Sequence, residues 1–467
     1  MSSSPLDDMV ATGKVYPYGS VCSRSVHQRR ETPGCCLPLV SPHRYSLSYR
    51  NFCRTLGMTH GSTMKGGRTP VQPGIHLLEN SIQHYAWGSP TAFTTFLGIP
   101  NPEGTPMAEL WMGAHPKAPS YVRLSDGERV PLGDLIERDP VSWLGAAAPR
   151  YGNVLPFLFK VLGVAQPLSI QAHPNKEQAR EGFERENREG IPLDAPHRNY
   201  RDPNHKPEVI CAVTPFWALR GFRSPGEIAR RFTHPAFEPL EQAVRDLRID
   251  PTPSGLSRFF RTLMTLEPQV KREVVTTASV AFRDHPEPEY QWLLRLADLY
   301  PGDIGVLAPL YLNLVKLAPG EAMFLPAGEL HAYLEGVGVE LMANSDNVLR
   351  GGCTPKHVDV PELLRILTFR GKDGVEVLSP REVAPGLWAY DLPTGEFALS
   401  CIEADDPVEV QVGSMEILVL LGDHAIFSWE GGTLELSRGQ SVVVAAVVGR
   451  YEVSVEGRLY RASLPVA

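Results

Sequence analysis

The sequence contains no long hydrophobic run, and its net charge is negative. The tightest apolar cluster, VVVAAVV at residues 442–448, falls well short of the roughly 18 to 20 apolar residues that a helix needs to cross a bilayer. Acidic residues outnumber basic ones by 53 to 45, which leaves a formal net charge of −8. Such a chain lacks the broad positive charge by which proteins bind polyanions. We therefore expect neither a membrane protein nor a nucleic-acid-binding protein.

Cysteine is also scarce, with seven in 467 residues and no Cys-x-x-Cys pair. This usage is typical of reduced thiols in the cytoplasm rather than of a disulfide framework. Four of the seven lie in residues 1–63, a serine-rich segment with seven Lys or Arg against three Asp or Glu. We interpret that segment as a disordered tail, a transit peptide or sequence translated from a start codon assigned too early. We favour the last interpretation, with Met58 or Met64 as the true start.

Recognisable organisation begins near residue 75 and alternates between β and α patterns. The chain is too long for one ordinary core, so several subdomains are expected. Short apolar segments interrupted by Pro, Gly and Asn predict strands, which return after a helical block and continue to the end. We expect an N-terminal extension at 1–74, a β domain in two parts at 75–214 and 301–370, a helical insertion at 215–300, and a second β domain at 371–467.

The helical insertion has a clear predicted start. In RSPGEIARRF, Ser224 can cap a helix, Pro225 suits its first position, and Glu227 completes a capping box. The segments LSRFFRTLMTL and YQWLLRLADLY follow with apolar residues at spacings of three and four. The region up to about Tyr300 is therefore predicted to be helical.

The short segment SIQAH places polar and apolar side chains alternately. Because side chains in a strand repeat with period two, Ser169, Gln171 and His173 share one face, and Ile170 and Ala172 share the other. Pro174 ends strand pairing just after the histidine. The polar face can line a pocket, although this pattern alone fits a simple hydrogen-bonded histidine as well as a metal ligand.

Two other segments carry further candidate ligands. In DPNHKPEVI, His205, Lys206 and Glu208 crowd the approach to an apolar strand. GEAMFLPAGELH, from Gly320 to His331, is similar to the second motif of the cupin family, in which a glycine- and proline-shaped hairpin delivers a histidine into a barrel mouth. Two imidazoles, one carboxylate and the amide oxygen of Gln171 suit a borderline divalent ion, zinc first.

The same spacing fails in the second β domain. GQSVVVAAVVGR has Ala445, Val447 and Arg450 where the first domain has proline, glycine and histidine. This domain resembles a cupin that cannot bind metal, so one zinc ion per chain is expected. The fold class is then mainly β with an α-helical insertion, as two cupin-like jelly-roll domains and a helical subdomain, with the catalytic centre in the first.

Six segments together resemble the type I phosphomannose isomerases, with matching order and spacing from about residue 77 to the end. They are YAWGS at 85–89, PFLFKVL at 156–162, LSIQAHP at 168–174, DPNHKPE at 202–208, FLPAGELHAYLEG at 324–336, and SDNVLRGGCTPKHVDVPELL at 345–364. The resemblance implies a zinc-dependent enzyme that interconverts D-mannose 6-phosphate and D-fructose 6-phosphate through an enediol. It also implies a cytoplasmic monomer that acts on a small sugar phosphate and supplies GDP-mannose biosynthesis or glycolysis.

Carried over by motif, the resemblance implies three groups of site residues. The zinc ligands are Gln171, His173, Glu208 and His331. The catalytic residues are Arg350, Lys206, Glu340 and Asp346. The substrate-binding residues are Lys160, Ser169, Tyr333 and His205.

The residue types fit the implied chemistry. An aldose to ketose isomerisation needs a base, a charge stabiliser and a grip on the phosphate. Arginine can form two parallel hydrogen bonds to a phosphate, whereas lysine acts as a point charge, so Arg350 is the first choice for that contact. Glu340 and Asp346 are the carboxylate candidates for the base, and His205 or Lys206 are the alternatives. The sequence does not choose among them.

Two other functions compete with the isomerase. A cupin oxygenase would use iron and oxygen, usually with more histidine ligands, and both Gln171 and the lack of a His-x-His motif argue against it. A non-catalytic cupin that binds sugar or metal would have lost acid and base residues, yet HKPE and SDNVLRGG are both intact.

Overall fold

The computed structural model describes residues 71–124 and 127–465. The expected N-terminal extension at 1–74, with Met58 and Met64, therefore lies almost wholly outside the described residues. Within the described residues the strands form three sheets, and no helix is long and apolar enough to span a membrane. The fold class predicted from sequence, mainly β with a helical insertion, is confirmed.

A ten-stranded antiparallel sheet makes up the first β domain. Its strands are β2 (Ser81–Gln83), β3 (Glu109–Gly113), β6 (Phe157–Val164), β7 (Ile170–Ala172), β8 (Glu208–Ala212), β9 (Phe216–Phe222), β10 (Leu312–Leu317), β11 (Ala322–Leu325), β12 (His331–Ala343) and β13 (Leu349–Gly352). The long strand β12 pairs with β7 and β9 through its first residues and with β6 and β8 through its last ones. One strand thereby carries candidate residues at both of its ends.

The first and last strands of the described residues share a nine-stranded sheet. In sheet order these strands are β14 (Arg381–Ala384), β15 (Leu387–Ala389), β16 (Ala398–Ile402), β23 (Leu459–Ser463), β18 (Glu416–Leu420), β21 (Ser441–Val444), β1 (Ile75–Glu79), β4 (Tyr121–Arg123) and β5 (Arg129–Pro131). Because β1 pairs with β21, residues from the start of the predicted first domain complete the sheet of the second.

A four-stranded sheet closes the second β domain. It contains β17 (Val408–Gln411), β22 (Arg450–Glu456), β19 (His424–Trp429) and β20 (Gly432–Ser437). An apolar cluster that includes Leu418, Val442, Phe427 and Val453 fills the space between this sheet and the nine-stranded one. The interior of the second domain is thus a packed apolar core.

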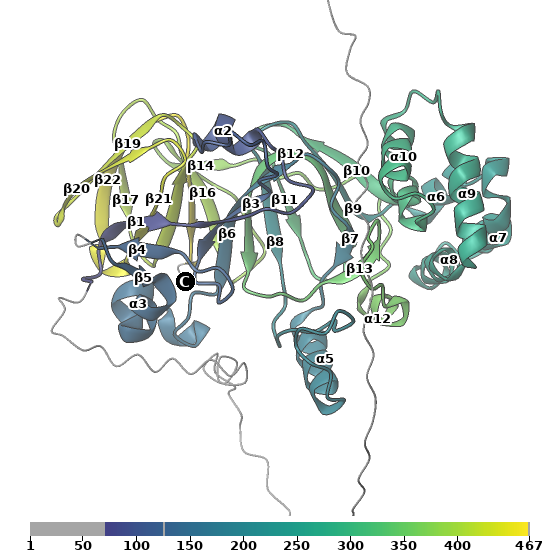
Figure 1. Ribbon diagram of the computed structural model, residues 1–467, viewed down its shortest axis with the longest axis horizontal. Helices are drawn as coiled ribbons and strands as arrows, with labels where there is room; N and C mark the ends of the chain where they lie inside the picture. Colours follow the sequence, from purple (N-terminus) through teal and green to yellow (C-terminus); the bar gives the residue numbers. More distant parts are fainter. Residues whose placement is uncertain (1–70, 125–126, 466–467) are drawn as a thin grey trace, which may run out of the picture. The chain divides into compact units, whose positions relative to one another are not determined.

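Helices α6–α10 gather beside β9 and β10 (Figure 1). They are α6 (Pro225–Arg231), α7 (Glu241–Ile249), α8 (Pro253–Thr265), α9 (Pro268–Ala281) and α10 (Pro288–Leu299), followed by α11 (Ala308–Tyr311). The predicted insertion at 215–300 therefore begins with a strand of the sheet, β9, before the helices start. The other α-helices in the described part of the chain are α2 (Ala92–Leu97), α3 (Leu132–Arg138), α4 (Pro140–Leu144), α5 (Lys176–Arg188) and α12 (Val360–Ile366).

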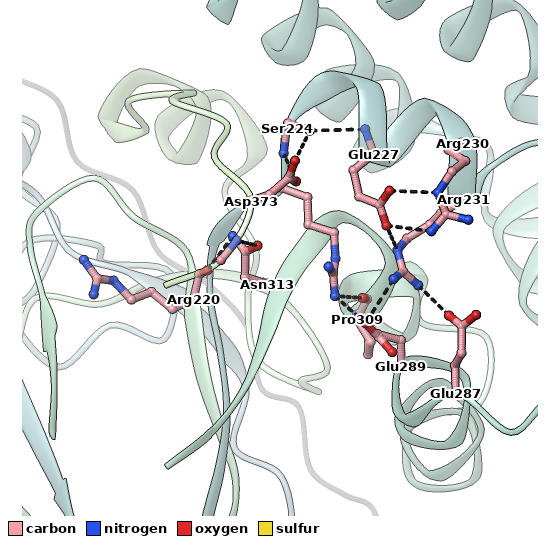
Figure 2. Close-up of polar contacts among 12 residues, drawn as sticks. Arg220, Ser224, Glu227, Arg230, Arg231, Glu287, Glu289, Pro309, Asn313 and Asp373 are labelled. Atoms are coloured by element: carbon pink, nitrogen blue, oxygen red, sulfur yellow. Dashed lines mark hydrogen bonds and ion pairs between the residues drawn. The ribbon is translucent and has the colours of Figure 1, made fainter. Parts of the chain in front are cut away.

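The start of α6 is confirmed, but its capping box is not the predicted one. The Ser224 side chain accepts a hydrogen bond from the Glu227 main-chain N–H, as an N-cap should. The reciprocal bond comes from Asp373, whose carboxylate accepts from the Ser224 main-chain N–H at 3.0 Å (Figure 2). The Glu227 carboxylate instead accepts hydrogen bonds from Arg230 and Arg231. A residue distant in sequence therefore completes the cap.

Alternation along β6, β8 and β12 decides which side chains face the interior of the first domain. Val161, Val209 and Val339 belong to the apolar cluster packed against the nine-stranded sheet. Side chains at the neighbouring positions point to the opposite face. Those positions include Lys160, Glu208 and Glu340, so this face of the sheet carries charge. All three are buried.

Candidate metal centre and active site

Four residues lie in one row across adjacent strands of the ten-stranded sheet. Arg220 on β9 is opposite His331 on β12, His331 is opposite Gln171 on β7, and Gln171 is opposite Arg350 on β13. Residues directly opposite each other share a sheet face. The row therefore places Gln171 between His331 and Arg350, although these residues come from separate parts of the sequence.

The back of this row is covered by the helical insertion. Ile170 and Ala172, which flank Gln171, belong to the apolar cluster of the helical region. The alternation predicted for SIQAH is thus observed, although strand β7 covers only Ile170–Ala172. Packing of the flanking residues on the helices fixes which way Gln171 faces.

Three side chains converge as a candidate metal site. Nε2 of His173 and Nε2 of His331 lie 3.4 and 3.3 Å from the same oxygen, Oε2 of Glu208. Among the described residues this is the group whose ligand atoms all lie within 4.8 Å of one another. Each residue is almost fully buried, with at most 1% of its surface exposed.

The other polar atoms of these ligands are occupied. Nδ1 of His173 lies 2.7 Å from the main-chain oxygen of Asn347, and Nδ1 of His331 lies 3.0 Å from that of Glu329. Because a carbonyl can only accept, each Nδ1 donates and each Nε2 is left with a free lone pair. Lys206 binds the second oxygen of Glu208 at 2.8 Å.

The three converging atoms have no hydrogen-bond partner among the described residues. Buried polar groups are nearly always satisfied, so three unsatisfied ones aimed at a common point indicate a missing partner. Two imidazole nitrogens and one carboxylate oxygen are donors that a divalent zinc ion accepts. Gln171, the predicted fourth ligand, is paired with His331 in the strand register. The residues present therefore fit a zinc ion.

The protonation states agree with this fit. Burial lowers the pKa of His173 to about 4, with the nearby Lys206 charge acting in the same direction. Burial alone would raise the pKa of Glu208, but Lys206 and His173 outweigh it and hold that pKa well below its ordinary value. At neutral pH the site thus presents a neutral imidazole and an ionised carboxylate, the forms that bind metal.

Asn347 joins the two loops that carry the remaining site residues. Its side chain accepts from the main-chain N–H of Arg201 at 2.7 Å and donates to the main-chain oxygens of Asp202 and Asn204, both at 2.8 Å. The carboxylate of Asp202 in turn accepts a hydrogen bond from the main-chain N–H of Asp346 at 2.7 Å. The loop before Glu208 and the loop before Arg350 are therefore one connected unit.

Lys160 and Glu340 form a buried ion pair inside the first β domain. They are opposite each other on β6 and β12, and Nζ lies 2.9 Å from Oε2. A second carboxylate, Glu109 on β3, lies 3.5 Å from the same Nζ. Glu109 was not among the predicted site residues, although its alternation with the apolar Leu110 in ELWMG indicates that the two side chains lie on opposite faces of the strand.

Asp346 is held by a lysine and a histidine that no sequence motif indicated. Lys117 lies 2.7 Å from one carboxylate oxygen, and Nε2 of His115 lies 3.6 Å from the other. Burial would raise the pKa of Asp346, but His115 and Lys117 outweigh it and hold that pKa far below its ordinary value. Asp346 is therefore ionised at neutral pH.

Arg350 belongs to a group of cations. Burial lowers its pKa, and so does the neighbouring charge of Arg201. The pKa of Lys356 is lowered by burial and by both arginines. Nε of Arg350 is buried without a partner among the described residues. Clustered cations of this kind attract a multiply charged anion.

The other predicted substrate residues have different surroundings. His205 pairs with Glu396 of the second domain, with Nε2 and Oε1 2.7 Å apart. Tyr333 is buried in an apolar cluster with its hydroxyl unpaired among the described residues, and its ring lies 6.4 Å from that of His331. Ser169 directly precedes β7 and is half-buried.

A cavity of about 720 Å³ lies near the second domain. Its walls include Arg220, Phe324 and Pro326 of the first domain and Tyr390 and Thr394 of the second. None of the three converging ligands lines it. The three buried ligands are therefore not part of the wall of this cavity.

The chain matches known proteins over most of its length. The family model for the phosphomannose isomerase type I catalytic domain matches residues 75–225. Mannose-6-phosphate isomerase of Escherichia coli is 43% identical over 394 residues, covering 82% of this chain and 98% of the relative. The human mannose-6-phosphate isomerase is 35% identical, covering 79% and 95%.

Solved structures agree with these relatives. A variant of phosphomannose isomerase from Salmonella typhimurium has a TM-score of 0.80 at 40% identity and covers 84% of this chain and 100% of its own. A zinc-bound mannose 6-phosphate isomerase has a TM-score of 0.79 with the same identity and coverage. The chain belongs to the type I phosphomannose isomerase family.

Proposed function

We propose that this chain interconverts D-mannose 6-phosphate and D-fructose 6-phosphate at a centre built from one zinc ion and the cations and carboxylates around it. The observation that carries the proposal is the convergence of the unpaired atoms of His173, Glu208 and His331 within 4.8 Å. The chain is a zinc-dependent isomerase by family. We further propose a role for each residue around the zinc site.

His173, Glu208, His331 and Gln171 would hold the zinc ion. When bound, zinc supplies a Lewis acid that polarises the sugar's carbonyl and hydroxyl oxygens. Asn347 and Glu329 orient the two imidazoles through their main-chain oxygens, and Lys206 orients Glu208. With a single carboxylate among four ligands, most of the metal's positive charge remains for the substrate.

Arg350 binds the phosphate group. Besides burial, the Arg201 charge lowers the pKa of Arg350, and the charges of both arginines lower the pKa of Lys356. The three side chains therefore form one positive region. A phosphate dianion neutralises like charges that otherwise repel each other. Arg350 is paired with Gln171 in the strand register, which supports a binding mode with the phosphate close to the metal.

Glu340 carries the proton between the two carbons. Burial raises the pKa of Glu340 above its ordinary value, although the Lys160 charge opposes the shift. A carboxyl group with a raised pKa takes up and returns a proton more readily near neutral pH. Asp346 stays ionised, and Lys206 is paired with Glu208. Both residues therefore contribute electrostatically and do not carry the proton.

The remaining residues shape the sugar site. His205 and Ser169 offer hydrogen bonds to sugar hydroxyls, and the unpaired hydroxyl of Tyr333 points to the same use. Lys160 stabilises the negative charge that develops on the substrate oxygen. Its place between two carboxylates keeps it charged, because Glu109 and Glu340 outweigh the effect of burial and raise its pKa.

The substrate class is a sugar phosphate. We also propose the compartment, the oligomeric state and the partners of the protein. We infer a cytoplasmic monomer without nucleic-acid or membrane partners. Cys211, Cys353 and Cys401 are buried free thiols, which suits a reducing compartment. Size-exclusion chromatography with light scattering tests the monomer.

One assay tests the proposed function. Purified protein is given mannose 6-phosphate, and fructose 6-phosphate is measured before chelation, after chelation and after zinc is restored. Turnover that disappears and returns with zinc is the expected result. A folded, zinc-loaded protein without turnover points to a non-catalytic binding protein, and oxygen consumption with sugar points to an oxygenase.

A further inference from the structure

Three strands bring a tryptophan, a lysine and a glutamate into one row. Trp111 on β3 is directly opposite Lys160 on β6, and Lys160 is directly opposite Glu340 on β12. Glu109 precedes Trp111 by two positions and therefore shares its face of the sheet. All four side chains face the interior of the first β domain.

Glu109 contacts two members of this row. Its Oε2 lies 3.5 Å from Nζ of Lys160 and accepts a hydrogen bond from the indole Nε1–H of Trp111. The Trp111 ring also lies 5.4 Å from Nζ of Lys160, within the range of a cation–π contact. Trp111 thus holds the Glu109 oxygen next to the ammonium group.

The charges in this cluster do not balance. Glu109, Lys160 and Glu340 are 8%, 6% and 4% exposed, so two carboxylates share one ammonium away from water. Burying a second negative charge beside the first is unfavourable unless one carboxylate takes up a proton or a further cation compensates. The charge of Glu109 therefore bears directly on the proton affinity of Glu340.

The other charged and titratable groups around Glu340 are few. Glu208 on β8 adds negative charge, Lys206 adds positive charge, and Tyr333 on β12 faces the carboxylate. These groups belong to the metal site or to its immediate surroundings. Glu109 is the contributor from β3, on the far side of Lys160 from Glu340.

We propose that Glu109 is a positioning residue for the isomerisation, which holds Lys160 between two carboxylates and keeps Glu340 able to retain a proton. The inference rests on the proposed function, because it gives Glu340 the role of proton carrier. In this role Glu109 acts through Lys160 and Glu340 rather than on the substrate. The raised pKa of Glu340, to which burial contributes most and Glu109 adds, agrees with the geometry.

The main test replaces Glu109 with glutamine. E109Q keeps the size of the side chain and an oxygen for the Trp111 N–H, but removes the negative charge. Loss of a nearby negative charge lowers the pKa of Glu340, so the acidic limb of the kcat/KM profile moves to lower pH. We expect a shift of about half a pH unit or more and about tenfold lower kcat, with unchanged zinc content. The matched control, E103Q, changes an exposed glutamate in the loop before β3 and should leave the profile in place.

A second measurement separates this inference from the proposed function. Infrared titration of the buried carboxyl band that disappears in E340Q reports the pKa of Glu340 without any turnover. That pKa should be lower in E109Q than in the parent chain. If E109Q does not fold, W111F takes its place, because it removes the indole donor but keeps the negative charge of Glu109. A smaller shift of the Glu340 pKa in the same direction is then expected. Coincident titrations and coincident pH profiles in parent and variant overturn the proposal, whereas absent isomerase turnover in the parent overturns only the proposed function.

Discussion

The main-chain oxygen of Asn347 accepts a hydrogen bond from Nδ1 of His173 at a distance of 2.7 Å. This contact leaves Nε2 as the atom of His173 that faces Glu208. The same asparagine uses its side chain to join the loop before Glu208 to its own loop. A residue that is not a ligand therefore sets both the tautomer of one ligand and the approach of another.

Replacing Asn347 with alanine should weaken zinc binding. The change removes the Asn347 side-chain hydrogen bonds to main-chain groups of Arg201, Asp202 and Asn204 and loosens the carbonyl that holds His173. We expect about 10- to 100-fold weaker zinc binding, measured by competition with a chromophoric chelator. A matched control is Asn313, another buried asparagine whose side chain donates to main-chain oxygens, including that of Arg220 (Figure 2). N313A should lower thermal stability while retaining zinc, and equal zinc loss in both variants would refute a specific role for Asn347.

Replacing His331 with alanine should abolish both zinc retention and turnover. Its Nε2 is one of the three converging unpaired atoms, and the sheet register offers no second imidazole at that position. Zinc content after dialysis, measured by elemental analysis, checks the first effect, and the isomerase assay checks the second. H424A alters a half-exposed histidine of the second domain and should keep full zinc. Normal activity of H331A would remove this histidine from the ligand set.

Replacing Arg350 with alanine should affect phosphorylated substrate far more than free sugar. Truncating one side of a charged hydrogen-bonded pair costs about 2 to 5 kcal/mol, which corresponds to a loss on the order of 30-fold or more in kcat/KM. The comparison is between mannose 6-phosphate and D-mannose with each variant. Since free mannose lacks the phosphate, its rate of turnover should change little. R370A, which alters an exposed arginine, is the control. Equal losses with both sugars would place Arg350 at the reacting carbons instead.

Glu227 should stabilise the protein in a pH-dependent way. Its hydrogen bonds with Arg230, together with the Arg231 pair, lower its pKa to about 2 against the opposing effect of burial (Figure 2). A carboxyl group with a depressed folded-state pKa stabilises above its ordinary pKa of about 4.5 and loses that contribution as the pH falls toward 2.

E227Q should therefore be less stable than the parent chain by about 1 kcal/mol at pH 7, after allowance for solvent screening. The difference in thermal midpoint between the two proteins should shrink from pH 7 to pH 3.5. E273Q, on the exposed face of α9, should match the parent at both pH values. A difference that stays constant with pH would show that the effect of E227Q is packing rather than charge.

Local sequence patterns were sufficient for several parts of this molecule. The alternation of SIQAH, the glycine and proline spacing before His331, and the cap at Ser224 depend on residues within a few positions of one another. Such features follow from backbone geometry and side-chain period. The mainly β fold with a helical insertion and the family of the chain were therefore predictable from sequence.

Other parts depend on strand pairing over long distances. Glu109 and His115 act on Lys160 and Asp346, and Asp373 completes the cap at Ser224, although each pair is separated by dozens to hundreds of residues. The pairing of β1 with β21 likewise joins the two ends of the described chain. Register between distant strands is decided by which faces are buried against which layer, and no local period contains that information. The sequence by itself thus determined the ligand types and their local faces, while the tertiary structure decided which charges surround them.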